Sequence, residues 1–107
     1  MSVRIERNGA VTTVIHSRYE ARNAMDPESA DALVAAFERF DSDPDSSVAV
    51  LWGEGGAFCS GWDLKYASAL KGSAKPLREL DFPADGSKPP RGALGPTRLN
   101  LSKPVIA

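Results

Sequence analysis

The alternation of apolar and polar positions predicts a β-hairpin at the start of the chain. Residues 3–7 (VRIER) and 11–15 (VTTVI) are rich in β-branched side chains. Between them, Asn8-Gly9 favours the positive φ of a tight turn.

Apolar residues then return every three or four positions, the periodicity of an amphipathic helix. Asp26-Pro27 supplies an N-cap and a proline suited to the first helical turn, and Asp43-Pro44 is expected to end the helix. Each large buried side chain contributes about 1.5–3 kcal/mol, so the apolar stripe is predicted to face a sheet. The stripe consists of Ala30, Leu33, Val34, Phe37 and Phe40.

Residues 48–52 (VAVLW) are apolar without alternation, which predicts a strand covered on both faces, with Trp52 and Phe37 in the core. The following Gly53-Glu-Gly-Gly56 lacks the Gly-Lys-Ser/Thr end of a P-loop and is interpreted as a turn. The expected element order is ββαβ.

Residues 72–98 hold five Pro, four Gly and eight charged side chains, so we expect a loop without a core element, acting as a mobile lid or as a passive disordered insertion. Residues 103–107 (KPVIA) predict the first residues of a buried strand. This apolar run stops without a cap, turn or polar tail, and we therefore expect residues 1–107 to be the N-terminal part of a single domain.

Composition narrows the function classes. Thirteen Lys and Arg balance 14 Asp and Glu in 107 residues, and a net charge of −1 argues against nucleic acid and against an anionic membrane surface. The charged N-terminus does not resemble a signal peptide, and no stretch approaches the ~20 apolar residues that span a bilayer. A single cysteine agrees with a reducing compartment, so the sequence predicts a cytoplasmic protein.

Residues 57–64 (AFCSGWDL) predict a tight turn at Ser60-Gly61-Trp62 that leads into a helix starting at Asp63-Leu64. Backbone N–H groups at such a turn have no intrahelical partner and could stabilise a carbonyl oxygen that becomes negative. Gly61 allows the bend and a close approach, and Asp63 is also suited to cap the helix.

Cys59 could suggest a nucleophile, but the sequence places no base beside it. We therefore expect Cys59 to be a small packed side chain and His16, the only histidine, to be structural.

Four ordered segments make the sequence similar to the crotonase, or enoyl-CoA hydratase/isomerase, superfamily. They are residues 20–25 (EARNAM), 26–43, 57–64 and 103–107. Tyr19 departs from the family, which commonly has Pro there, and this departure concerns only the local turn. The resemblance implies an α/β fold with a ββα spiral core, of which this chain is the N-terminal fragment.

The resemblance implies a coenzyme A thioester substrate whose carbonyl oxygen lies between two backbone N–H donors. The Trp62 N–H occupies the first, catalytic position; the second donor and the acid/base glutamates would lie beyond Ala107. Arg22 has a guanidinium that matches phosphate oxygens, although a solvated loop arginine is the alternative. The implied substrate- and coenzyme A-binding residues are Arg22, Ala24, Ser60, Gly61, Trp62, Asp63 and Leu64.

The activity implied by the resemblance is hydration of a 2-enoyl-CoA; the alternatives are isomerase, thioesterase or decarboxylase chemistry, a non-catalytic crotonase-fold module that binds a protein or nucleic acid, or a truncated product without a stable fold. No metal and no cofactor are implied, because coenzyme A enters as part of the acyl- or enoyl-CoA substrate. A homotrimer or hexamer is expected at full length. The 107 residues alone are expected to show negligible catalysis.

Overall fold

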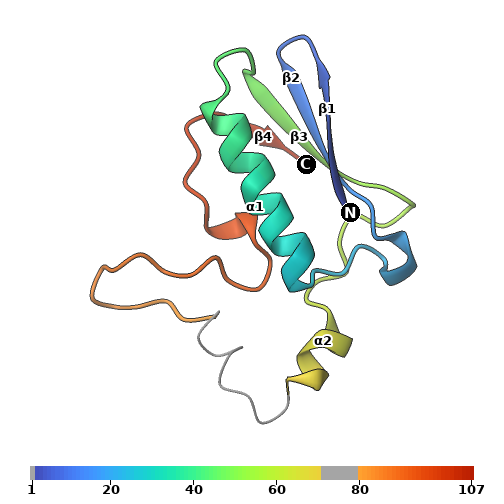
Figure 1. Cartoon of the computed structure of the whole chain (residues 1–107), viewed down its shortest axis with the longest axis vertical. Helices are drawn as coiled ribbons and strands as arrows, with labels where there is room; N and C mark the ends of the chain where they lie inside the picture. Colours follow the sequence, from blue (N-terminus) through green and yellow to red (C-terminus); the bar gives the residue numbers. More distant parts are fainter. Residues whose placement is uncertain (1, 71–79) are drawn as a thin grey trace.

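The computed structural model describes residues 2–70 and 80–107. In this part of the chain, a four-stranded sheet packs against one long helix, α1 (Pro27–Ser42) (Figure 1). The strands lie in the order β1 (Val3–Asn8), β2 (Val11–His16), β3 (Val48–Gly53) and β4 (Val105–Ile106). The β1–β2 pair is antiparallel and the other two pairs are parallel, so the predicted ββαβ order is confirmed.

The hairpin turn lies one residue later than predicted. Asn8 pairs with Val11, which leaves Gly9 and Ala10 as the two central residues instead of Asn8 and Gly9. Gly9 has a φ of 60° and Ala10 is not among the residues with positive φ. A type II′ turn needs positive φ only at its first central position, where glycine is preferred, and this explains the shift.

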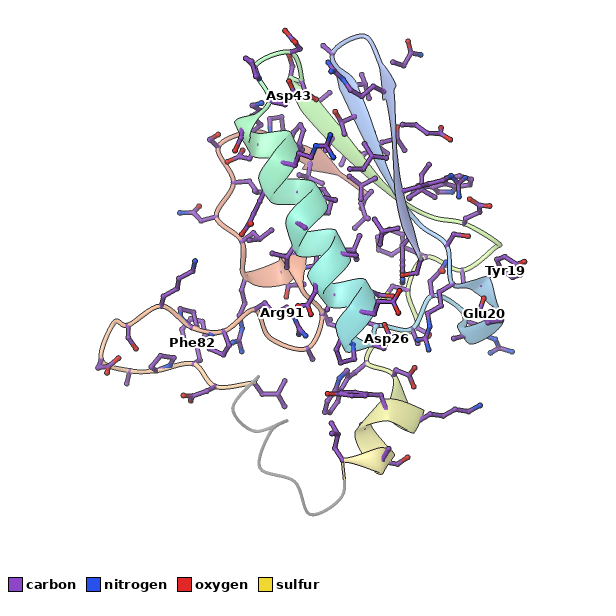
Figure 2. All side chains as sticks on the ribbon, in the orientation of Figure 1. Tyr19, Glu20, Asp26, Asp43, Phe82 and Arg91 are labelled. Atoms are coloured by element: carbon purple, nitrogen blue, oxygen red, sulfur yellow. The ribbon has the colours of Figure 1, made fainter. Side chains whose placement is uncertain are left out.

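Helix α1 has the predicted boundaries, with Asp26 at its N-cap and Asp43 at its C-cap (Figure 2). The Asp26 carboxylate accepts a hydrogen bond of 2.9 Å from the Ser29 N–H, as an N-cap should. Four of the five predicted stripe residues face the sheet: Leu33 and Phe37 are 1% exposed and pack with Ala30 and Phe40 in one cluster with core residues of the strands. Val34 is only partly buried and lies outside this cluster.

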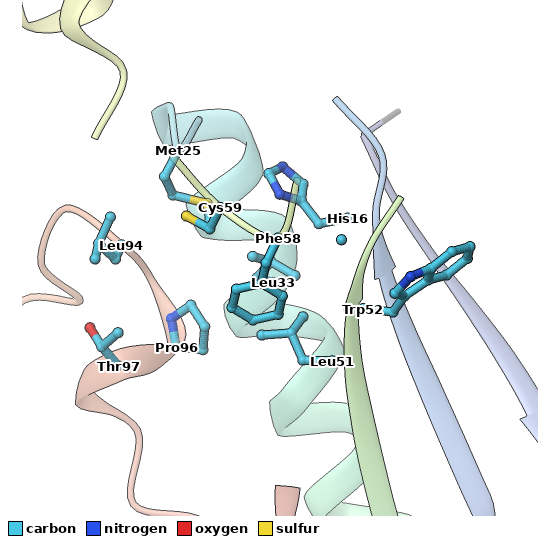
Figure 3. Close-up of a pocket in the computed structure, with 11 residues that line it drawn as sticks. His16, Met25, Leu33, Leu51, Trp52, Phe58, Cys59, Leu94, Pro96 and Thr97 are labelled. Atoms are coloured by element: carbon cyan, nitrogen blue, oxygen red, sulfur yellow. The ribbon is translucent and has the colours of Figure 1, made fainter. Parts of the chain in front are cut away.

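The prediction that β3 is covered on both faces, with Trp52 in the core, is wrong for the part of the chain described. Leu51 and Trp52 lie on opposite sides of β3 (Figure 3), and the Trp52 side chain is 48% exposed. Helix α1 covers one face, and no second layer covers the other among residues 2–70 and 80–107. An apolar run shows that both faces can be buried, but not which element covers each.

Strand β4 forms where residues 103–107 predicted a strand, but it is not buried. Val105 pairs with Ala49 of β3 and is 39% exposed, while Ile106 is 59% exposed. Both lie at the edge of the sheet, where a strand is covered from one side only.

The predicted loop at 72–98 needs one correction. Residues 71–79 lie outside the described part of the chain, and residues 80–95 form no regular helix or strand. However, Leu94 packs against the core and is followed by a short 3-10 helix, η2 (Pro96–Arg98), which contacts α1.

Within the described ranges, no helix has the length and apolar character needed to cross a membrane.

Candidate functional site

The turn that follows β3 lies against the segment that precedes α1. The Met25 N–H donates to the Gly61 carbonyl (2.7 Å), and the Asp63 N–H donates to the Met25 carbonyl (2.9 Å), so that Met25 and Trp62 form a parallel β-bridge. Gly61 has a φ of 100°, as expected for this bend, although a Cβ there would meet nothing within 4 Å. The positive φ of the bend therefore explains why residue 61 is a glycine. The close approach that the sequence also suggested is not seen among the described residues.

The bridge determines the direction of the Trp62 N–H. Since N–H groups alternate in direction along an extended segment, and Asp63 donates toward Met25, the Trp62 N–H points to the other side. It has no acceptor among the described residues. Its indole packs edge-on against Tyr66, with ring centroids 6.4 Å apart.

The buried side chain of Asn23 connects the loop before α1 with the loop after β3. It is 0% exposed, adopts a φ of 56°, and accepts a hydrogen bond from the Arg18 N–H (2.6 Å). Its Nδ2 donates to the carbonyls of Glu54 (2.9 Å) and Ala57 (2.7 Å). Asparagine tolerates left-handed backbone better than most residues, so a single side chain satisfies three backbone groups.

Arg18 connects the N-caps of two helices. Its guanidinium lies 2.7 Å from the carboxylate of Asp63, the N-cap of α2 (Leu64–Ala69), and 3.4 Å from that of Asp26, the N-cap of α1. The hydrogen bond from Arg18 is the main cause that lowers the pKa of Asp63, helped by the Tyr66 N–H. The predicted helix start at Asp63-Leu64 and the capping role of Asp63 are therefore confirmed.

The structure brings six of the seven predicted binding residues into one groove of about 670 Å³. Arg22 is exposed in a left-handed conformation (φ 53°), at the end of the 3-10 helix η1 (Tyr19–Ala21). This short helix forms despite Tyr19. The six residues are Arg22, Ala24, Ser60, Trp62, Asp63 and Leu64.

Gly61 does not line the groove, and three charged residues that the sequence analysis missed do: Arg18, Glu20 and Lys65. Lys65 directly follows the 57–64 segment and could have been found from that position. Glu20 opens the 20–25 segment and could also have been found from its position. Arg18 lies at the start of η1, whose fold depends on the buried Asn23, so the local sequence carried no signal for it.

Figure 3 shows a second hollow, an apolar cavity of about 150 Å³. It is lined mainly by apolar side chains, including Met25, Leu51, Phe58 and Leu94. Cys59 and His16 also line it, so the structure brings together a thiol and an imidazole that the sequence did not place near each other. Cys59 is exposed, against the prediction of a packed side chain, and its Sγ accepts a 3.4 Å hydrogen bond from the Gly61 N–H.

His16 is 2% exposed, and its Nε2 has no partner among the described residues. Burial lowers the pKa of His16, as does the positive charge of Arg18, while Asp26 and Glu20 raise it. The imidazole is therefore held neutral at physiological pH. No group of three His, Cys, Asp or Glu in the described ranges is placed to hold a metal ion.

A model of the family described as enoyl-CoA hydratase/isomerase matches residues 6–81, which includes both loops of the groove. The chain belongs to the enoyl-CoA hydratase/isomerase family.

Two relatives and two solved structures illustrate the membership. The chain is 38% identical to the enoyl-CoA hydratase EchA19 of Mycobacterium tuberculosis over 96% of its length and 36% of the relative's. It is 40% identical to a carnitinyl-CoA dehydratase of Salmonella arizonae over 99% of its length and 37% of the relative's.

A probable enoyl-CoA hydratase/isomerase structure from Mycobacterium abscessus is 35% identical, with a TM-score of 0.71 over 97% of this chain and 35% of that one. The enoyl-CoA hydratase EchA1 structure from Mycobacterium marinum is 29% identical, with a TM-score of 0.72 over 97% of this chain and 36% of that one. The α/β crotonase fold expected from the sequence is thus confirmed, and the chain spans little more than a third of the length of these relatives.

Replacing Asn23 should destabilise the chain strongly. Asn23→Ala leaves two partly buried carbonyls and one N–H without their partner, and we expect the free energy of unfolding in urea to fall by about 3 kcal/mol. Asn23→Asp keeps the acceptor but loses both donated bonds, so it should be at least as damaging. The exposed Asn100→Ala is the matched control and should change stability by less than about 0.5 kcal/mol. Equal effects of the Asn23 and Asn100 variants would contradict this role.

His16 should make stability depend on pH. Because burial lowers the folded pKa of His16 below its ordinary value of 6.5, the unfolded chain binds more protons between these two pKa values. The stability contribution is complete above about pH 6.5 and is lost as the pH falls through the folded pKa. His16→Leu has no titrating imidazole at this position and so removes this pH-dependent contribution to stability. Urea unfolding at several pH values should therefore show a wild-type curve that drops more steeply below pH 6.5 than the variant's; parallel curves would contradict it.

Proposed function

We propose that the protein acts on an acyl- or enoyl-CoA thioester, with addition of water to a 2-enoyl-CoA as its reaction. The observation that carries the proposal is the groove: Trp62, whose N–H has no acceptor among residues 2–70 and 80–107, lines it together with Arg22 and Lys65. A backbone donor for a carbonyl oxygen and cations for phosphate groups are the two kinds of contact that a coenzyme A thioester needs. The single cysteine agrees with a cytoplasmic location, which we include in the proposal.

Three cations and two carboxylates line the groove, and this small excess of positive charge favours an anionic ligand. Arg18 is largely neutralised by the carboxylates of Asp63 and Asp26. The exposed Arg22 and Lys65 are left to contact phosphate oxygens, and the guanidinium of Arg22 can do so in a bidentate way.

The names of two relatives support hydration chemistry. One is an enoyl-CoA hydratase and another a carnitinyl-CoA dehydratase. Addition and removal of water are the same reaction in opposite directions, and both need a thioester carbonyl that can become an enolate. We therefore prefer a hydratase or dehydratase over isomerase, thioesterase or decarboxylase activity.

In the proposed mechanism, the Trp62 N–H donates to the thioester oxygen and stabilises the negative charge that develops there. Removing one such donor typically costs about 10²–10³ in rate. The groups that add and remove protons would lie outside these 107 residues. We therefore expect the 107-residue chain to bind thioesters without hydrating them, which a crotonyl-CoA assay can check.

The Trp62 donor can be removed without changing a side chain. Segments 1–58 and 59–107 can be made by synthesis and joined at Cys59, with an ester in place of the Gly61–Trp62 amide. The infrared carbonyl band of a ¹³C-labelled thioester should move to lower frequency on binding to the all-amide chain and should not move on binding to the ester chain. Affinity for coenzyme A itself should stay the same in both. An identical carbonyl shift in both chains would rule out Trp62 as the donor.

Arg22 is expected to contribute to affinity for coenzyme A. Arg22→Asn keeps a residue that tolerates the left-handed backbone while removing the charge, and should weaken binding about tenfold or more, as measured by calorimetry. Arg39 lies exposed on α1, and Arg39→Asn should leave affinity unchanged. If the Arg22 variant binds as tightly as wild type, Arg22 is only a solvated loop residue.

A further inference from the structure

Strand β1 is an open edge of the sheet. It pairs with β2 on one side, and no strand in residues 2–70 and 80–107 lies on its other side (Figure 1). An edge strand presents unpaired backbone N–H and C=O groups, which form a template for pairing with another strand. Ile5, in the middle of β1, is 39% exposed, so the open edge also carries an apolar side chain.

The register of the hairpin determines which backbone groups point outward. The Ser17 N–H donates to the carbonyl of Ser2, the residue opposite it, at 2.7 Å. Hydrogen-bonded and non-hydrogen-bonded pairs alternate along an antiparallel ladder, so residues 4, 6 and 8 also bond to β2. Val3, Ile5 and Arg7 therefore direct their N–H and C=O groups to the open edge, where no backbone partner is found in the described part of the chain.

Arg4 and Glu6 flank Ile5 on the face of β1 that is turned away from α1. Side chains alternate along a strand, and Val3 lies in the core on the α1 side. The side chains of Arg4 and Glu6 are 48% and 65% exposed, and Arg4 Nε lies 3.7 Å from Glu6 Oε1. Glu54, 2.5 Å from Arg4 Nη2, holds the guanidinium on the same face.

These charges favour pairing of β1 with itself in one register. If two copies pair antiparallel with Ile5 opposite Ile5, the outward backbone groups of both strands meet, and each Arg4 lies opposite Glu6 of the other copy. Opposite charges at directly opposed positions stabilise a pair of strands. The four charges then alternate in sign across the contact.

The neighbouring registers are unfavourable. Only residues with outward groups can bond to each other, so the pairing can shift only by two residues at a time. Such a shift places either Arg4 opposite Arg4 or Glu6 opposite Glu6, and like charges directly opposite each other are destabilising. Charged side chains on edge strands usually prevent pairing, whereas these charges permit one register and disfavour its neighbours.

We propose that the open edge of β1 is an interface between two copies of this chain. The two β1 strands pair antiparallel about a two-fold axis between the Ile5 residues, so the two four-stranded sheets become one continuous sheet. Residues 3, 5 and 7 make the backbone hydrogen bonds, the two Ile5 side chains cover each other, and Arg4 and Glu6 form two ion pairs between the copies. This contact is separate from the groove and needs no thioester.

Amide hydrogen exchange, measured by NMR at rising protein concentration, tests the contact directly. The N–H groups of Ile5 and Arg7 should be open to solvent in the monomer and protected in the dimer, which sedimentation measures on the same samples. Arg4 and Glu6 bond to β2 in both states, so the protection of their N–H groups should change little. A dimer in which Ile5 and Arg7 stay unprotected overturns the proposal, as does a chain that remains monomeric up to about 1 mM.

Two charge reversals test the register. Glu6→Arg brings arginines opposite each other at both positions, and Arg4→Glu brings glutamates opposite each other. Each variant alone should self-associate at least about tenfold more weakly than wild type, because a two-fold contact counts every substitution twice. In an equimolar mixture each variant supplies the charges that the other lacks, so a dimer with one copy of each should form.

The mixture also guards against a folding defect. A misfolded chain would not regain association only in the presence of its complement, and circular dichroism checks each variant alone. Glu38→Arg, on the exposed surface of α1, changes the net charge as Glu6→Arg does, and it is the matched control that should associate as wild type does. A mixture that associates no more tightly than either variant alone overturns the proposal.

The other open edge of the sheet is β4, where Ile106 is 59% exposed. Ile106→Glu should leave the dimer unchanged. Loss of the dimer in Ile106→Glu, with association unchanged in Glu6→Arg and Arg4→Glu, would show that the copies meet at β4 and would overturn the assignment to β1.

Discussion

The structure depends on one buried amide. Asn23 has no exposed surface and bonds to backbone groups of Arg18, Glu54 and Ala57. These groups belong to two loops that are more than 30 positions apart in sequence, and buried backbone groups need partners. By satisfying them, the Asn23 side chain brings the loop before α1 against the loop after β3. The bridge between Met25 and Trp62, the direction of the Trp62 N–H and the groove all follow from that contact.

Charge reinforces the same junction. Arg18 lies between the carboxylates that cap α1 and α2, so both helices start from one point. Asp26 and Asp63 each cap a helix, and both carboxylates form ion pairs with the Arg18 guanidinium. Because Arg18 is paired in this way, Arg22 and Lys65 are the exposed cations of the groove.

A short partition, residues 59–60, contributes to two hollows of different polarity, the groove and the apolar cavity. The groove carries charged residues, whereas the cavity behind it is lined mainly by apolar side chains. Neighbouring residues in the partition, Ser60 and Cys59, contribute to opposite sides.

Local pattern in the sequence was sufficient for the elements themselves. The hairpin, the boundaries of α1 and the capping of α2 by Asp63 each depend on contacts within a few residues, and they appear as predicted apart from a one-residue shift in the turn. The family resemblance of the 57–64 segment also identified four groove residues, and residues 22 and 24 from the 20–25 segment made six in all. Tertiary structure alone decided what covers each surface: Trp52 is exposed because α1 covers only the other face of β3, and Leu94 joins the core from a segment that reads as a loop. It also decided that His16 and Cys59 share a cavity and that Arg18 reaches the groove. The reason is that local propensity acts over one or two turns of chain, whereas burial and pairing depend on which distant segments meet.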